Sequence, residues 1–240
     1  MTSPSLWLRR GISPQLRERL GRYGRHLRAL FAPEPFRTVL PYTMVGLKRL
    51  RTLDELAHRI DTLGIPGDIV ECGACNGGSG AILARVASQS AHQRRTWLLD
   101  SFAGLPAASS EDGDMAAEYT GLCQAHPANV KRVLRKSGVP EEAVGIVPGW
   151  FQDTLPTLPV RQIALLHIDA DWYDSVRICL ELLYDKVVPG GFVVLDDYGY
   201  WEGCRKAWHE FEGGRGLHID LIQVDGTGVY FQKPHAEASA

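Results

Sequence analysis

The stretch Asp68-Ile69-Val70-Glu71-Cys72-Gly73-Ala74-Cys75-Asn76-Gly77-Gly78-Ser79 decides the fold. Its first half is a short run rich in apolar residues, and a helical pattern over residues 80–87 follows its glycine-rich half, which predicts a buried strand, a turn and a helix. Glycines let the backbone approach a ligand closely and leave the first amides of the helix free to meet it. The G-x-x-x-G-G spacing differs from the dinucleotide fingerprint, so the turn indicates a nucleotide-like ligand without naming one.

The rest of the chain repeats this alternation of strand and helix. Strands that are apolar on both faces and separated by helices predict a parallel α/β sheet with right-handed crossovers. Near the end, two runs flank Asp225-Gly226-Thr227, a length that suits an antiparallel hairpin. We therefore predict a mostly parallel seven-stranded sheet with a C-terminal antiparallel hairpin. The predicted strands are residues 68–71, 96–99, 144–147, 163–168, 192–195, 217–224 and 228–232.

Two helices are predicted before the sheet begins. Four leucines and a tyrosine recur every three or four positions over residues 15–31, at 16, 20, 23, 27 and 30, which predicts an amphipathic helix with an arginine-rich outer face. A second helical pattern covers residues 45–63 and stops at Gly64. We expect an N-terminal helical lid or oligomerisation segment over residues 1–64, one α/β domain over 65–234 and a tail over 235–240.

Charge divides the chain unevenly. The first 30 residues hold seven arginines and one glutamate, a charge of +6, so a net charge of -2 leaves -8 on the other 210 residues. The acidic body would repel phosphates, and no aromatic-basic platform is present, so no nucleic-acid partner is expected. No run approaches the ~20 apolar residues of a membrane span, and no apolar signal segment follows the first arginines. We expect a cytoplasmic protein.

The five cysteines are odd in number and irregular in spacing, which is a poor disulfide framework. Cys72 and Cys75 form a C-x-x-C pair that could be a redox site, or a zinc site completed by Cys123 and His126. The glycine-rich turn accounts better for Cys72 and Cys75, because they lie inside it. We favour no role in redox or zinc chemistry.

Acidic residues follow three of the predicted strands. Asp100 ends the second strand, where it could accept hydrogen bonds from ribose hydroxyls or simply cap a turn. Carboxyl ends of adjacent strands line one crevice, so four further carboxylates should converge there. Like charges this close are unfavourable unless a cation neutralises them, and oxygen ligands suit Mg²⁺. These four are Asp169, Asp171, Asp196 and Asp197.

Two neighbouring residues are read differently. Asp174 best fits a surface aspartate that caps the following helix. His167 is expected to be a strand residue that faces a neighbouring helix.

These motifs resemble, in order, those of the macrocin O-methyltransferase-like family, magnesium-dependent S-adenosyl-L-methionine (SAM) methyltransferases that modify sugars on antibiotics. The resemblance covers roughly residues 40–233 and is specific for the family more than for one substrate. The matching stretches are residues 42–44, 67–79, 100–102, 104–106, 149–156, 168–175, 189–198 and 226–233.

The resemblance implies a class I SAM-methyltransferase fold and a set of site residues. Matched to the motif of that family, the metal ligands are Asp169, Asp196 and Asp197, and the position of the general base is Asp171. The methionine end of SAM is expected at the glycine-rich turn, the ribose on Asp100 and the adenine near Trp150. The residues expected to bind SAM are Thr43, Met44, Glu71, Gly73, Asn76, Gly77, Gly78, Ser79, Asp100, Ser101, Phe102, Trp150 and Phe151.

A metal that takes two neighbouring substrate oxygens predicts a vicinal diol as the acceptor. A deoxysugar on a glycosylated natural product is the simplest such substrate, and a catechol is the enzymatic alternative. A SAM-binding regulator without catalysis is a different class, against which the intact carboxylates argue. Families of this kind are often oligomeric, so a homo-oligomer is expected.

Overall fold

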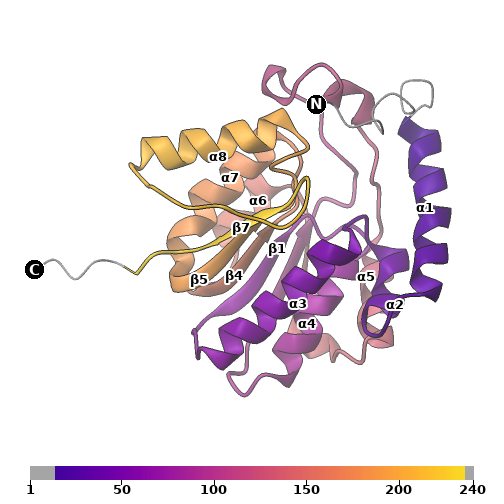
Figure 1. The fold of residues 1–240 in the computed structure, drawn as a ribbon, viewed down its shortest axis with the longest axis horizontal. Helices are drawn as coiled ribbons and strands as arrows, with labels where there is room; N and C mark the ends of the chain where they lie inside the picture. The colour runs from indigo at the N-terminus through magenta and orange to yellow at the C-terminus, as the bar shows by residue number, and fades with distance from the viewer. Residues whose placement is uncertain (1–13, 236–240) are drawn as a thin grey trace, which may run out of the picture.

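The computed structural model describes residues 14–235 as one seven-stranded sheet with helices on both faces (Figure 1). The strand order is β3-β2-β1-β4-β5-β7-β6, and the first five strands are parallel. β7 pairs antiparallel with β5, and β6 with β7. The predicted class I SAM-methyltransferase fold is confirmed. The strands are β1 (Asp68–Cys72), β2 (Thr96–Asp100), β3 (Val144–Pro148), β4 (Ile163–Ile168), β5 (Val187–Leu195), β6 (Ile222–Gln223) and β7 (Val229–Gln232).

Helices form two layers that enclose the sheet (Figure 1). One layer contains α3, α4 and α5, and the other contains α6, α7 and α8. All six residues of β4 are buried, as expected of a strand covered on both faces. The helices are α1 (Pro14–Leu30), α2 (Phe36–Val39), α3 (Leu47–Thr62), α4 (Gly78–Gln89), α5 (Pro127–Lys136), α6 (Phe151–Thr154), α7 (Tyr173–Leu183) and α8 (Glu202–Gly214).

The order of the strands reverses between β1 and β4. In the register, Glu71 of β1 lies beside Leu98 of β2 on one side and beside His167 of β4 on the other. Loops that follow β1 and β4 therefore leave the same edge of the sheet in opposite crossover directions. Open α/β sheets bind their ligands at such a switch point.

Two predicted strands differ from the observed ones by more than one residue. β6 covers only Ile222–Gln223 instead of residues 217–224, because Leu217, Ile219 and Leu221 pack against the core without joining the ladder. β5 begins at Val187 instead of at residue 192, since a register shift opposite β4 accommodates the Pro-Gly-Gly sequence inside the strand.

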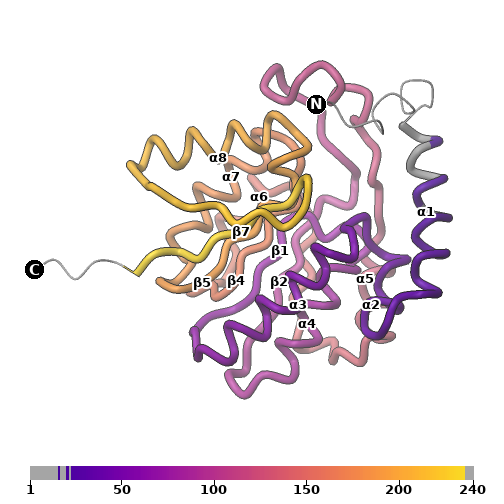
Figure 2. Tube along the Cα trace, in the orientation of Figure 1, coloured from indigo at the N-terminus to yellow at the C-terminus, as the bar shows by residue number. Residues whose placement is uncertain are grey.

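α1 covers Pro14–Leu30, within one residue of the predicted helix, but its leucine stripe is exposed in this chain. α1 packs against α2 and the short turn Leu40–Tyr42, and Figure 2 shows it along one side of the molecule. Ala29 is buried against this surface, whereas the leucine stripe points away from it. The exposed side chains of the stripe are Leu16 (47%), Leu20 (53%), Tyr23 (74%), Leu27 (62%) and Leu30 (66%).

No helix among residues 14–235 is long and apolar enough to cross a membrane.

Close packing of α4 on the sheet yields a stability prediction at Gly80. A Cβ there would lie 2.6 Å from Glu71 Oε2 and 2.6 Å from Leu98 Cδ2, so Gly80→Ala should lower the free energy of unfolding by about 1–3 kcal/mol. Gly213→Ala in α8 is the control, since its Cβ would meet nothing within 4 Å. Urea unfolding should show that control unchanged or slightly more stable. Equal effects at both positions would contradict the packing.

Candidate active site

The glycine-rich turn and the loop after β4 are packed into one unit. Gly73 has a φ of +98°, and a Cβ there would lie 1.7 Å from the carbonyl oxygen of Asp169. The Asp169 amide donates to the Cys72 carbonyl at 2.9 Å. Only glycine meets both the backbone conformation and the close approach. The turn predicted to meet a cofactor is thus held directly against the predicted metal site.

Asp100 ties the same turn to the end of β2. Its Oδ2 accepts from the Cys75 amide at 2.7 Å, and its Oδ1 accepts from the Phe102 amide at 2.6 Å. Burial raises the pKa of Asp100, although these two backbone hydrogen bonds act to lower it. Each carboxylate oxygen keeps a further lone pair that can accept a ligand hydroxyl.

A cavity of about 470 Å³ opens at this edge of the sheet. The glycine-rich turn, the end of β2, the loop after β3 and the loop after β4 form its wall. Eight of the predicted site residues therefore surround one space. They are Met44, Gly73, Asp100, Ser101, Trp150, Phe151, Asp169 and Asp171.

Other residues predicted to bind the cofactor lie outside this cavity. Thr43 and Asn76 line an adjoining cavity of about 670 Å³, which shares Met44 with the first. Phe102 packs against the hydrophobic core beside α4 and α5. The remaining four are buried in or packed beneath the turn: Glu71, Gly77, Gly78 and Ser79.

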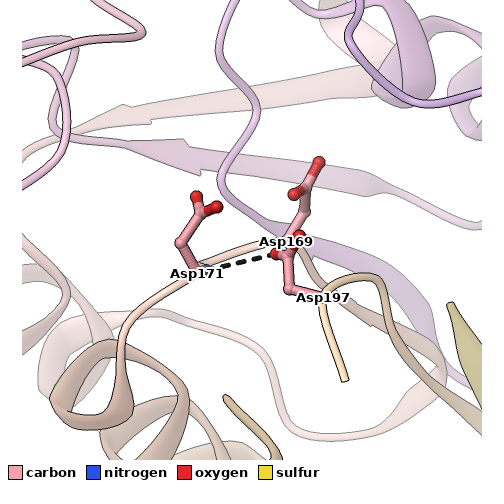
Figure 3. Close-up of side chains that lie close together, drawn as sticks. All are labelled: Asp169, Asp171 and Asp197. Carbon is pink, nitrogen blue, oxygen red and sulfur yellow. Dashed lines mark hydrogen bonds between the residues drawn. The ribbon is translucent and has the colours of Figure 1, made fainter. Parts of the chain in front are cut away.

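Three carboxylates converge beside the cavity (Figure 3), and two of them, Asp169 and Asp171, line it. Single oxygens of Asp169, Asp171 and Asp197 lie within 4.8 Å of one another. The Asp171 amide donates to Asp197 Oδ2 at 3.3 Å, and Trp201 Nε1 donates to Asp171 Oδ1 at 2.7 Å. Asp171 has a φ of +55°, a conformation that costs energy for a residue with a side chain. The loop therefore holds Asp171 in a strained backbone conformation that places its carboxylate beside those of Asp169 and Asp197.

Burial and mutual repulsion oppose ionisation of these carboxylates. The pKa values of Asp169 and Asp197 are raised well above the ordinary value, first by burial and then by the neighbouring aspartates. Burial also raises the pKa of Asp171 to about 6, with the Trp201 hydrogen bond acting in the opposite direction. An all-oxygen donor set of this kind fits a hard divalent cation, which would keep the carboxylates ionised.

Asp196 lies beside this group but faces two cations. Its Oδ2 is ion-paired with Arg49, and its Oδ1 lies 3.6 Å from His167 Nε2. That Oδ1 is buried and has no hydrogen-bond partner. Among the nearby charges, Asp196 contributes most to the raised pKa of Asp169. A buried carboxylate oxygen without a partner beside three other carboxylates again fits a metal ligand.

His167 does not face a helix as predicted. Its Nδ1 lies 3.0 Å from Glu71 Oε1 and its Nε2 faces Asp196, so the imidazole is fully buried between two carboxylates. Burial lowers the pKa of His167, but its contacts with Asp196 and Glu71 outweigh burial and raise the pKa to about 9. The sequence shows only that Glu71 and His167 are polar residues in otherwise apolar strands, and the pairing of β1 with β4 brings them together.

The cysteines form no disulfide among the described residues, and all five are free. The group of Asp169, Asp171 and Asp197 is the one possible metal cluster of histidine, cysteine or acidic residues within residues 14–235. Asp174 is exposed in the first turn of α7 and lies 3.5 Å from Arg177.

Both a family of proteins and individual relatives match this chain. The sequence profile of the family described as Macrocin-O-methyltransferase (TylF) matches residues 14–233. The chain is 37% identical over 207 residues to the 8-demethyl-8-(2,3-dimethoxy-alpha-L-rhamnosyl)-tetracenomycin-C 4'-O-methyltransferase of Streptomyces olivaceus, covering 83% of this chain and 77% of that protein. It is 34% identical to the mycinamicin III 3''-O-methyltransferase of Micromonospora griseorubida, covering 80% and 78%.

Solved structures show the same fold. The O-methyltransferase NovP superposes with a TM-score of 0.73 at 33% identity, over 81% of this chain and 83% of that one. The calicheamicin methyltransferase CalS11 gives a TM-score of 0.70 at 22% identity, over 92% and 93%.

The buried His167 predicts a specific dependence of stability on pH. With a pKa raised from 6.5 to about 9, its proton stabilises the folded protein fully below pH 6.5, and this contribution is lost as pH rises through 9. The difference in free energy of unfolding between wild type and His167→Gln should therefore fall by at most about 1.4 kcal/mol per pH unit between these limits. Urea unfolding at a series of pH values measures it, and a constant difference would contradict a charged His167.

Proposed function

Because the chain belongs to the macrocin O-methyltransferase family, we propose that it methylates one hydroxyl of a vicinal diol on the sugar of a glycosylated natural product, with SAM as donor and Mg²⁺ as metal. The observation that carries this proposal is the carboxylate cluster at the edge of the cavity, which Asp169 and Asp171 line together with Gly73 of the glycine-rich turn. Both named relatives methylate the hydroxyl groups that their names state, on antibiotic molecules or their precursors.

The glycine-rich turn and Asp100 are proposed to hold SAM, which supplies an electrophilic methyl group on its sulfonium. The backbone at Gly73 can approach the methionine end closely because it carries no side chain. Asp100 can accept from ribose hydroxyls while its two backbone hydrogen bonds fix its orientation. Trp150 and Phe151 offer aromatic surface in the same wall for the adenine. Met44 reaches the cavity from the segment before α3 and would cover the cofactor.

Asp169, Asp196 and Asp197 are proposed to hold Mg²⁺, which when bound lowers the pKa of a hydroxyl and fixes two neighbouring oxygens. Asp196 is included because its Oδ1 is buried without a hydrogen-bond partner beside the cluster. Asp171 is proposed as the general base. One of its oxygens accepts from Trp201, which leaves the other to accept the proton of the acceptor hydroxyl. Burial raises the pKa of Asp171, which makes this carboxylate a stronger base.

Turnover with a panel of acceptors tests this function. The protein, SAM and Mg²⁺ are incubated with glycosylated natural products that carry free vicinal hydroxyls, with the same compounds methylated at one of them, and with catechols. We expect a gain of one methyl group by mass on a free diol sugar and none on the blocked sugars. If only catechols are methylated, the acceptor is a small phenol and not a sugar. If no diol is methylated, the proposal is contradicted.

Variants of the carboxylates separate the two proposed roles. Asp169→Asn should weaken Mn²⁺ binding and lower turnover together, whereas Asp171→Asn should lower turnover by about 10²–10⁴-fold while Mn²⁺ binding persists. Asp220→Asn, an exposed aspartate that lines neither cavity, is the control and should change neither. Electron paramagnetic resonance of Mn²⁺ measures binding without SAM or acceptor. Unchanged turnover in Asp169→Asn, or after chelation of divalent ions, would remove the metal from the mechanism.

The exposed leucine stripe of α1 is proposed to pack against a second copy of the chain. Its members are spaced by four and three residues in turn, the period of a helix-packing seam, and monomers rarely expose such a continuous apolar surface. The arginine-rich first 30 residues and the acidic remainder of another copy also attract each other. Residues 1–13 of this segment lie outside the described part of the chain.

Sedimentation of a stripe variant tests this assembly. The double variant Leu20→Glu and Leu27→Glu should sediment as a monomer, while wild type sediments as a larger species. Leu63→Glu replaces a comparably exposed leucine after α3 and should behave as wild type. A monomeric wild type, or a double variant that assembles normally, would contradict the proposal.

A further inference from the structure

Arg49 is a largely buried cation that α3 brings to the carboxylate cluster. It lies in the first turn of α3, and its side chain is 16% exposed. Its Nη1 donates to the carbonyl oxygen of Asp196 at 3.2 Å and also contacts Asp196 Oδ2. Its Nε lies 3.2 Å from Asp225 Oδ2. The guanidinium therefore joins the N-terminal segment, the end of β5 and the C-terminal hairpin.

The hairpin turn is shaped to receive this side chain. Asp225 Oδ1 accepts from the amides of Thr227 and Gly228, both at 2.9 Å, so one oxygen organises the turn while the other faces Arg49. A Cβ at Gly228 would lie 2.7 Å from Arg49 Cδ and 3.2 Å from Arg49 Cγ. The φ of Gly228 is not in the left-handed region, so the glycine serves to leave space for the arginine.

Arg49 also determines which oxygen of Asp196 stays available. By holding the backbone carbonyl and Oδ2 together, it fixes the rotamer of the aspartate. Oδ1 is then left buried, with no hydrogen-bond partner and 3.6 Å from His167 Nε2. Partners that hold one atom of a metal-binding side chain commonly orient the other atom for the metal.

The same segment reaches the cofactor turn at its other end. A Cβ at Gly78 would lie 2.7 Å from Thr43 Cβ, so Thr43 is packed on the start of α4. Six residues later, Arg49 contacts Asp196. Residues 43–49 therefore span the proposed SAM site and the proposed metal site and are fixed at both ends.

We propose that Arg49 is a positioning residue that orients Asp196 as a ligand for the divalent cation. This inference rests on the proposed function, since it assumes that Asp196 belongs to the metal site. The opposite role is that of a built-in cation that competes with the metal for Asp196. The two roles predict opposite changes in cation affinity when Arg49 is replaced. Loss of a competing positive charge tightens cation binding, whereas loss of a positioning contact weakens it.

Titration of the full-length protein with Mn²⁺ distinguishes the positioning role from the competing role. Electron paramagnetic resonance monitors the binding, without SAM or acceptor. Arg49→Met should weaken Mn²⁺ binding by about 10–100-fold. Arg49→Lys keeps the charge but has no planar guanidinium to reach Asp196 and Asp225 at once, so its Mn²⁺ affinity should fall between those of wild type and Arg49→Met. Lys48→Met removes one positive charge from the neighbouring exposed position and should bind as wild type does.

A second pair of variants moves Arg49 without changing any charge. Gly228→Ala displaces the arginine side chain and should also weaken Mn²⁺ binding, whereas Gly226→Ala in the same turn meets nothing within 4 Å and should not. This pair decides the question if Arg49→Met fails to fold. Binding that is unchanged or tighter in Arg49→Met and Gly228→Ala would overturn the positioning role. Absence of Mn²⁺ binding by wild type would instead overturn the proposed metal site.

Discussion

Four aspartates crowd the edge of the sheet at β4 and β5, and their repulsion is the constraint to which the surrounding structure responds. Like charges in a partly buried site are unfavourable unless cations accompany them. The chain supplies two, Arg49 from α3 and His167 from β4, and both reach Asp196. Asp169, Asp171 and Asp197 have no such partner among the described residues apart from the field of Arg49. The chain thus places its own positive charge beside Asp196 only, and a bound divalent cation would relieve the repulsion that remains among the four carboxylates.

This cluster is inseparable from the glycine-rich turn. Gly73 packs against the backbone of Asp169, so the loops after β1 and β4 cannot move independently. Glu71, beneath the turn, is linked through His167 to Asp196. A methyl donor bound at the turn would therefore be held at a fixed distance from an acceptor bound at the carboxylates. Fixing two reactants in this way is a large part of what a methyltransferase contributes to rate.

Much of this arrangement is predictable from the sequence, and the remainder depends on packing across the sheet. Apolar runs, the turn at residues 225–227 and aspartates at strand ends depend on local pattern, and the observed strands follow them. The roles of His167 and Arg49 depend on which side chains they contact. Glu71 is 96 residues away from His167 in the sequence and Asp196 is 147 residues away from Arg49, so no local pattern carries that information. The surface that covers the leucine stripe of α1 is unspecified for the same reason, because periodicity identifies an apolar face without identifying its partner.

The central claim is that this edge of the sheet holds a divalent cation beside the methyl donor. A crystal grown with Mn²⁺ and S-adenosyl-homocysteine, with anomalous diffraction at the manganese edge, tests it most directly. The account predicts one strong anomalous peak contacted by Asp169, Asp196 and Asp197, with Arg49 on Asp196 and Asp171 still hydrogen-bonded to Trp201. A site without a peak, or a manganese held by Asp171 in place of Asp196, would contradict it.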